Sequence, residues 1–427
     1  MGMFIYNLLF PLGFFFFLPE LLVKYRCRGG WKSTFGERFA RYGARETELK
    51  EFRGAIWIHA VSVGETVVAL SMIRKYLLRY PDKKFILSTT TTTGQDVARN
   101  NIPENTAVIF CPIDFPWMIR KALKLLQPSA LVIFETEIWP NLISGAAKRN
   151  IPVFLVNARM SDHSARGYRK LAKIFFAPLL QKFTGILTQT ETDAERFLSV
   201  SPQASVTVAG NMKFDQKLPA LPDGNALAEY FNYTGNTTVI FGASTHPGEE
   251  TLLVECFLSL RQEFPDLKLV IVPRHAERGD DIARILNDKS IKFARRSKTE
   301  SSSGGDNDVL LADTTGEMLY LMRNADIVVM GKSFAGHDEG HNLIEPALLK
   351  KAIVTGAVLR NFRFLLQVLT AKDAVKTVAD DSELTPVLAE LLANDDLRSN
   401  YGNKAFAAIS EHAGASDKTL AALSKLF

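Results

Sequence analysis

Cysteine is scarce in this chain, with three in 427 residues. Cys27, Cys111 and Cys256 are too few and too widely spaced for a disulfide framework or a four-ligand zinc site. A reducing compartment therefore fits the composition best.

The chain also has no large excess of positive or negative side chains. The chain has 51 Lys and Arg against 46 Asp and Glu, a net charge of +5, and the excess lies in residues 24–45, which hold seven basic residues and one acid. The nearly neutral remainder argues against nucleic acid as the partner. With 47% hydrophobic and 23% charged residues, disordered and collagen-like classes are excluded.

The first 23 residues, MGMFIYNLLFPLGFFFFLPELLV, contain almost no polar side chains apart from Asn7 and Glu20. This run is long enough to span a bilayer, which takes about 20 apolar residues. Basic residues follow the run rather than precede it, which predicts a retained anchor with the next domain on the cytoplasmic side of the membrane. Pro11 and Pro19 would interrupt a spanning helix, so a helix lying in the membrane interface is the alternative. A buried N-terminal core helix is disfavoured, because Phe14 to Phe17 leave no polar face.

From residue 55 the chain alternates short apolar runs with amphipathic stretches. Runs such as AIWIHAV (55–61), ALVIF (130–134) and PVFLV (152–156) are typical of strands buried on both faces of a parallel sheet. The alternation weakens at 216–238 and resumes with TVIFGAS (238–244). We therefore predict an α/β protein with an anchor (1–23), a Rossmann-like domain (24–215), a linker (216–238) and a second Rossmann-like domain (239–427). Ligands of such sheets bind beyond the carboxyl ends of the strands, so we expect the two domains to face a cleft that holds the active site.

The first strand-to-helix turn carries Glu65, in the segment HAVSVGE (59–65). A carboxylate at a helix N-terminus and at a strand's carboxyl end is placed to accept a proton from a substrate hydroxyl. Two alternatives stay open. Glu65 would merely cap the helix, or Ser62 would be the nucleophile of a hydrolase, since AVSVG approximates the G-x-S-x-G elbow.

The second half offers groups suited to an anion. Small residues around Ser244 open a turn before a helix, and Arg274 at the end of LKLVIVP could hold a phosphate or carboxylate with its planar guanidinium. The glycine-rich stretch 331–346 could cradle a phosphate, although no Walker A motif is present. His337 and His341 lie four apart, but their surrounding glycines favour a loop over a zinc helix, so no metal site is predicted.

Together these stretches resemble the Kdo transferases of bacterial lipopolysaccharide synthesis, which transfer 3-deoxy-D-manno-octulosonic acid (Kdo) from its CMP-activated form to a lipid A precursor. The resemblance covers nearly the whole chain. Beyond the apolar N-terminus with its basic flank, it rests on the segments His59–Glu65, Phe134–Asn141, Asn157–Arg159, Gly210–Asp215, Ser244–Glu249, Pro273–His275, Gly316–Met318 and Gly340–Pro346.

The resemblance implies a GT-B glycosyltransferase that inverts the anomeric carbon and needs no metal or other cofactor. Its partners would be CMP-Kdo and the lipid A precursor (lipid IVA) at the cytoplasmic face of the inner membrane. Glu65 would be the general base. The residues implied to bind the CMP-sugar are Ser244, Arg274, His275, Gly316, Met318, Ser333, Asn342 and Glu345.

Two residues depart from the family's pattern. Lys332 stands where a glycine is common, and Glu339 stands where a second glycine often precedes Gly340. Lys332 would add a cation beside the donor pocket. Besides the serine hydrolase, a non-catalytic nucleotide-sugar-binding scaffold at the membrane is a competing hypothesis, and the number of Kdo residues transferred is left open.

Overall fold

The computed structural model describes residues 2–27, 36–234, 236–298 and 305–424, with the side chains of 17–27 left out. The predicted basic flank therefore lies partly outside the described residues, because Arg28 and Lys32 fall in the gap and the side chains of Lys24 and Arg26 are not described. Two compact units form the chain. Unit 1 comprises Met1–Gln216 and Ala413–Phe427, and unit 2 comprises Lys217–His412.

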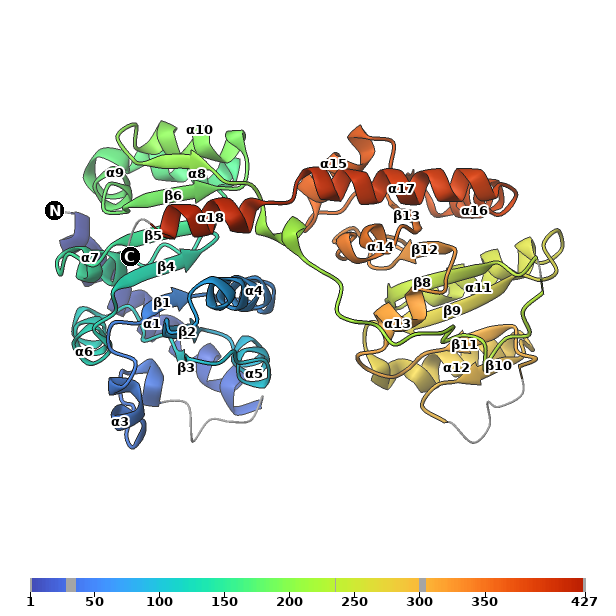
Figure 1. Ribbon diagram of the computed structural model, residues 1–427, viewed down its shortest axis with the longest axis horizontal. Helices are drawn as coiled ribbons and strands as arrows, with labels where there is room; N and C mark the ends of the chain where they lie inside the picture. Colours follow the sequence, from blue (N-terminus) through green and yellow to red (C-terminus); the bar gives the residue numbers. More distant parts are fainter. Residues whose placement is uncertain (1, 28–35, 235, 299–304, 425–427) are drawn as a thin grey trace. The chain divides into compact units, whose positions relative to one another are not determined.

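Unit 1 is built on a seven-stranded parallel sheet in the order β3-β2-β1-β4-β5-β6-β7, with helices on both faces (Figure 1). The strands are β1 (Ile56–His59), β2 (Phe85–Thr89), β3 (Thr106–Phe110), β4 (Ala130–Phe134), β5 (Val153–Ala158), β6 (Gly185–Thr188) and β7 (Val206–Val208). The helices are α1 (Gly2–Cys27), α3 (Arg45–Lys50), α4 (Val63–Arg79), α5 (Thr92–Asn100), α6 (Pro116–Leu126), α7 (Pro140–Ala147), α8 (Asp162–Lys170), the π-helix η1 (Ala172–Phe176), α9 (Ala177–Leu180), α10 (Glu191–Val200), the 3₁₀ helix η2 (Met212–Asp215) and α18 (Ala415–Ser424).

Unit 2 repeats this design with the sheet order β10-β11-β9-β8-β12-β13-β14, again parallel throughout. Its strands are β8 (Val239–Thr245), β9 (Lys268–Pro273), β10 (Phe293–Arg295), β11 (Val309–Leu311), β12 (Ile327–Met330), β13 (Ala352–Gly356) and β14 (Lys376–Val378). Its helices are α11 (Glu249–Leu260), η3 (Ala276–Arg278), α12 (Gly279–Asp288), α13 (Met318–Met322), α14 (Ile344–Leu348), α15 (Arg363–Ala371), η5 (Asp381–Glu383), α16 (Leu384–Leu392) and α17 (Asp395–Glu411).

Burial on both faces explains why these runs form central strands. All four residues of β1 are buried. Trp57 packs in one apolar cluster of unit 1, whereas Ile56 and Ile58 pack in another on the opposite face of the sheet. The predicted doubly wound α/β class is thereby confirmed.

The unit boundaries differ from the predicted ones at two places. The stretch from Lys217 to Thr238, predicted as a linker, belongs to unit 2, where Leu227, Tyr230 and Phe231 are buried. The C-terminal helix α18 belongs to unit 1, because Leu420 and Leu423 enter its core. The carboxylate of Asp215 also accepts the backbone N–H groups of Gly414 and Ser416.

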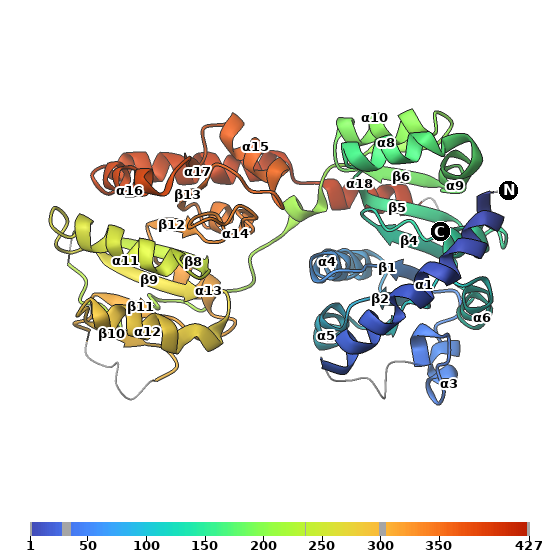
Figure 2. The ribbon, with the colours of Figure 1, turned by 180° about the vertical axis from the view of Figure 1, so that it is seen from behind.

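Helix α1 runs across unit 1 (Figure 2) and packs on it with one face. The Tyr6 hydroxyl donates to Asp114 at 3.0 Å, and the Asn141 amide donates to Asn7 at 2.7 Å. The rings of Phe10 and Phe14 each lie 5.3 Å from that of Phe115.

The opposite face of α1 is apolar and exposed, with Phe4 74%, Leu8 60%, Leu12 65% and Phe16 79% exposed. The predicted membrane-spanning anchor is not supported. Within the part of the chain that the structure describes, no helix is both long enough and apolar enough to cross a membrane.

Candidate functional site

Glu65 lies just beyond the carboxyl end of the central strand β1. The strand ends at His59, Ser62 is the N-cap, and α4 begins at Val63. The sheet reverses its order between β1 and β4, so this turn lies at the topological switch point, where open α/β sheets bind their ligands. The residue predicted to be the base thus lies where the topology favours a ligand site.

The Glu65 carboxylate is 7% exposed and held by local hydrogen bonds. It accepts from the Val61 backbone N–H at 2.8 Å and from the Ser62 hydroxyl at 2.7 Å, and the Ser62 oxygen accepts from the Glu65 N–H at 3.3 Å. This reciprocal arrangement is a capping box. Glu65 therefore does cap α4, as one alternative stated. The same bonds hold its carboxylate in place at the carboxyl-end edge of the sheet.

Burial raises the pKa of Glu65, and the charge of Glu135 raises it further, against the lowering effect of the Val61 and Ser62 bonds. A carboxylate whose pKa is raised towards neutrality is a better proton acceptor than an exposed one. The local electrostatics therefore suit a general base.

Two further glutamates lie near Glu65, and the sequence did not mark them as site residues. Glu135 follows β4 in the left-handed region, with φ of 55°, and is 5% exposed. Glu137 has its pKa raised by burial and then by the charge of Glu65. Glu135 forms ion pairs with Lys213 at 3.0 Å and Arg159 at 3.1 Å. Glu135 and Glu137 both follow the buried strand β4, and this position could have marked them as site residues. Parallel strands bring the residues that follow them to one edge of the sheet.

The contacts of Ser62 do not support the serine hydrolase hypothesis. A serine nucleophile needs a base within hydrogen-bond reach that is itself oriented by a third group. The Ser62 hydroxyl donates to Glu65, whereas His59 directs its Nδ1 to the Ser88 hydroxyl at 3.0 Å. Burial lowers the pKa of His59 to about 4, so its ring is neutral at physiological pH.

In unit 2, several residues predicted to bind the donor meet at the carboxyl ends of β8 and β9. The Arg274 backbone N–H donates to Thr245 at 3.0 Å, which joins the two strand ends. The Ser244 hydroxyl lies 3.5 Å from the Met318 sulfur, and Gly316 occupies the left-handed region with φ of 92°. The side chains of Arg274 and His275 are exposed there.

The glycine-rich loop after β12 does not offer the predicted backbone cradle, because a carboxylate already occupies it. Glu249 accepts the backbone N–H groups of Lys332 and Ser333 at 2.9 Å and that of Phe334 at 3.0 Å. It also accepts the His246 N–H at 2.8 Å. These four donors are unavailable to a phosphate while Glu249 holds them.

The Ser333 hydroxyl is likewise used inside unit 2. It donates to the Met330 carbonyl at 2.7 Å and accepts the Gly356 N–H at 3.1 Å, and Ser333 is 8% exposed. Asn342 and Glu345 lie farther along, at the start of α14, where the Asn342 side chain accepts the Ile344 N–H at 3.1 Å. Ser333, Asn342 and Glu345 were all predicted to bind the CMP-sugar. The hydroxyl of Ser333 instead forms its hydrogen bonds inside unit 2.

Four histidines gather beside these residues, a cluster that sequence spacing did not reveal. His246 has ring contacts with His275, His337 and His341. Within the described ranges, no group of three or more His, Cys, Asp or Glu residues is arranged to hold a metal ion.

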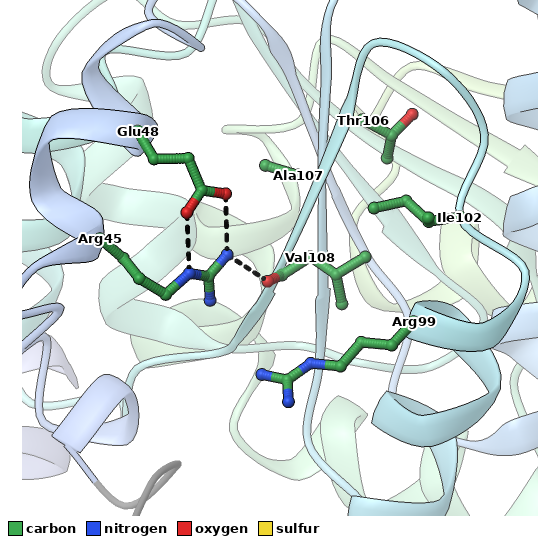
Figure 3. Close-up of a pocket in the computed structure, with 7 residues that line it drawn as sticks. All are labelled: Arg45, Glu48, Arg99, Ile102, Thr106, Ala107 and Val108. Carbon is green, nitrogen blue, oxygen red and sulfur yellow. Dashed lines mark hydrogen bonds and ion pairs between the residues drawn. The ribbon is translucent and has the colours of Figure 1, made fainter.

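A cavity of about 350 Å³ opens on unit 1, and none of the predicted site residues lines it. Figure 3 shows Arg45, held by Glu48 and the Val108 carbonyl, on one side and Arg99 on another. Its walls come from α3, α5 and the edge strand β3. The cavity is therefore separate from the turn that carries Glu65.

Comparison with known proteins decides the family. Residues 33–216 match the family model described as 3-deoxy-D-manno-octulosonic-acid transferase (kdotransferase). The 3-deoxy-D-manno-octulosonic acid transferase of Bordetella pertussis is 32% identical over 412 residues, covering 93% of each chain. The chain belongs to the Kdo transferase family. Its relative in Haemophilus influenzae is 28% identical, over 91% of this chain and 90% of that one.

As a member of the Kdo transferase family, the protein is a glycosyltransferase. Its fold is of the GT-B type. The crystal structure of Acinetobacter baumannii MurG matches with a TM-score of 0.53 at 13% identity, over 87% of this chain and 99% of that one. At that identity the likeness concerns the fold alone.

Proposed function

We propose that this Kdo transferase moves Kdo from CMP-Kdo to a hydroxyl of a lipid A precursor, with inversion, in lipopolysaccharide core synthesis. Glu65 removes the proton of the acceptor hydroxyl, and unit 2 binds the CMP-sugar. The observation that carries the proposal is the buried Glu65 carboxylate with a raised pKa at the switch point of unit 1. Since CMP is a good leaving group, one base and a cationic phosphate site suffice for the chemistry.

The donor roles are those that the family resemblance implies. Arg274 pairs with the phosphate, Gly316 and Met318 receive the base, Asn342 and Glu345 contact phosphate and ribose, and Ser244 lines the same site. His275 lies next to Arg274 and completes this set.

A direct test is the mass of the lipid product. The purified protein is incubated with CMP-Kdo and the tetraacylated disaccharide precursor, and the lipid is examined by mass spectrometry. We expect the precursor mass to rise by one or more whole Kdo increments, which also gives the number transferred. A precursor of unchanged mass, or one that has lost an acyl chain as a hydrolase would produce, contradicts the proposal.

We further propose that α1 lies in the cytoplasmic leaflet of the inner membrane rather than crossing it. The packed face of α1 contacts η1, where the ring of Phe175 stacks on Tyr6 at 5.9 Å, and the neighbouring Ile174 is 49% exposed. Exposed basic side chains lie on α8 and η1, at Arg166, Arg169, Lys170 and Lys173. Exposed apolar side chains together with cations are suited to an anionic lipid surface.

The paired substitution Leu8→Asp, Leu12→Asp tests this surface. Both side chains are exposed, so the fold should persist, while each loses about 2 kcal/mol of apolar burial in lipid. We expect binding to vesicles containing phosphatidylglycerol, measured by flotation, to fall by at least about tenfold. Leu78→Asp, at a position 87% exposed on α4, is the matched control and should bind as the unmodified protein does. Equal flotation of the double variant and the control would rule out this surface.

A further inference from the structure

Four of the five histidines of unit 2 converge from three loops at the carboxyl ends of its strands. His246 follows β8, His275 follows β9, and His337 and His341 follow β12. The His246 ring lies 5.2 Å from that of His341, 5.5 Å from that of His337 and 6.2 Å from that of His275. The strand order reverses between β8 and β12, so the cluster occupies the ligand-binding switch point of this sheet.

Two of these rings, those of His246 and His341, are joined by a hydrogen bond. The Nε2 atoms of His246 and His341 are 3.0 Å apart, so one donates and the other accepts. The donating ring then carries an unprotonated Nδ1 that can take up a proton without breaking the pair. Protonation there makes the ring an imidazolium and turns the bond into a charge-assisted one. His337 lies outside this pair, and its Nε2–H donates to the Pro247 carbonyl at 3.2 Å.

The charged groups that face the pair are mostly cationic. The charges of Lys332 and Arg274 act on His341, and those of Lys332, His337 and His275 act on His246. Burial first, and then these charges, lower the pKa of each ring to about 4, so the pair is neutral when no ligand is bound.

The nearby acids are already engaged. Glu250 binds the Arg278 guanidinium at 2.6 and 3.1 Å, and Glu249 accepts its four backbone N–H groups. Glu339 lies at 3.7 Å from the Lys332 ammonium. Lys332 is therefore partly neutralised by Glu339, and the charge of Arg274 remains to act on the pair.

We propose that His246, His341 and Lys332 form a receptor for an oxyanion of the donor, and that the histidine pair takes up a proton when this oxyanion binds. The inference rests on the proposed function, because it takes the ligand to be a CMP-sugar. The oxyanion is either the nucleotide phosphate or the sugar carboxylate. Its charge offsets Lys332 and Arg274, so Nδ1 of the donating ring accepts a proton from solvent. One N–H bond forms there, and the buffer acid or water that supplied the proton loses one.

The uptake of a proton determines whether the affinity for the oxyanion rises or falls with pH. Because the bound state holds more protons, oxyanion affinity falls as pH rises, by at most tenfold per pH unit for one proton. The test is calorimetric titration with CMP-Kdo, CMP and cytidine at one pH near 7 in two buffers of different ionisation enthalpy. The difference in heat gives the number of protons taken up.

Proton uptake with CMP but not with cytidine supports the phosphate as the oxyanion, and uptake with CMP-Kdo alone supports the sugar carboxylate. His246→Gln and His341→Gln should each abolish the uptake and weaken binding by about tenfold, the loss of one charge-assisted hydrogen bond. His163→Gln, an exposed histidine on α8, is the matched control and should leave both unchanged. Thermal melting checks that the variants are folded. Protons exchanged by the CMP phosphate itself contribute to the heat in every variant alike, so they do not affect the comparison.

The inference is overturned if CMP and CMP-Kdo bind without taking up a proton, or if the uptake persists in both glutamine variants. In those cases the proposed function stands. If none of the three ligands binds, both the inference and the proposed donor fall.

Discussion

Replacing Glu65 with glutamine is expected to lower kcat for Kdo transfer by about 100- to 10,000-fold, the usual contribution of a general base. Glutamine retains the size of the side chain and one oxygen for the capping bonds, but it cannot accept a proton. CMP affinity should stay near that of the unmodified protein, since the proposed nucleotide site lies in unit 2. The rate is measured by CMP release and lipid mass at saturating donor and acceptor.

Two controls separate catalysis from capping. Glu195→Gln, on the exposed surface of α10, should transfer Kdo normally. Ser62→Ala removes the N-cap hydroxyl and should cost about 1 kcal/mol of stability, with a milder loss of rate than Glu65→Gln. If Ser62→Ala abolishes transfer while Glu65→Gln is active, Glu65 is not the base.

Glu249→Ala is expected to have the second large effect, on unit 2. The substitution leaves four backbone N–H groups without the buried carboxylate that accepts them, three of them in the loop that carries Lys332. Losing such a buried, multiply bonded charge costs about 3 to 5 kcal/mol of unfolding free energy. The loop and His246 should then lose their positions, so the KM for CMP-Kdo should rise while the KM for the lipid changes little.

Glu249→Gln should lower stability and CMP binding less than Glu249→Ala does. One carboxylate oxygen accepts from Ser333 and Phe334 and the other from His246 and Lys332, so an amide can satisfy only one of the two pairs. We expect losses between those of alanine and the unmodified protein in urea unfolding and in CMP titration. Glu255→Ala, exposed on the same helix, is the control. Normal stability of Glu249→Ala would show that the loop does not depend on this carboxylate.

The central strands were predictable because they are buried on both faces and therefore apolar throughout. The run ALVIF was predicted at 130–134, and β4 spans Ala130–Phe134. The edge strand β7 was missed because Val206–Val208 is not fully buried and leaves no continuous apolar run. Helix α18 was assigned to the wrong unit because tertiary contacts alone place it in unit 1, through the core packing of Leu420 and Leu423 and the bonds of Asp215.

The candidate site was predictable where a residue directly follows a strand. Arg274 directly follows β9 and Glu65 lies in the turn region after β1, and both were predicted as site residues from these positions. The role of Glu249 was not, because its partners lie 83 to 85 residues farther along the chain and bind through their backbone. The histidine pair depends in the same way on two loops meeting across the switch point, since His246 and His341 are 95 residues apart. The apolar N-terminus predicted contact with lipid, but its length and composition did not reveal that one face of α1 packs on unit 1.

The pH dependence of kcat/KM for Kdo transfer tests the role of Glu65 most directly. The base must be ionised to act, and burial raises the pKa of Glu65, so activity is lost as pH falls through a value above the usual glutamate pKa of about 4.3. We predict a rising limb centred above that value for the unmodified protein, and its absence from the residual activity of Glu65→Gln. A profile that stays flat from about pH 4 to about pH 8, or a limb that survives in Glu65→Gln, would contradict the assignment of Glu65 as the base.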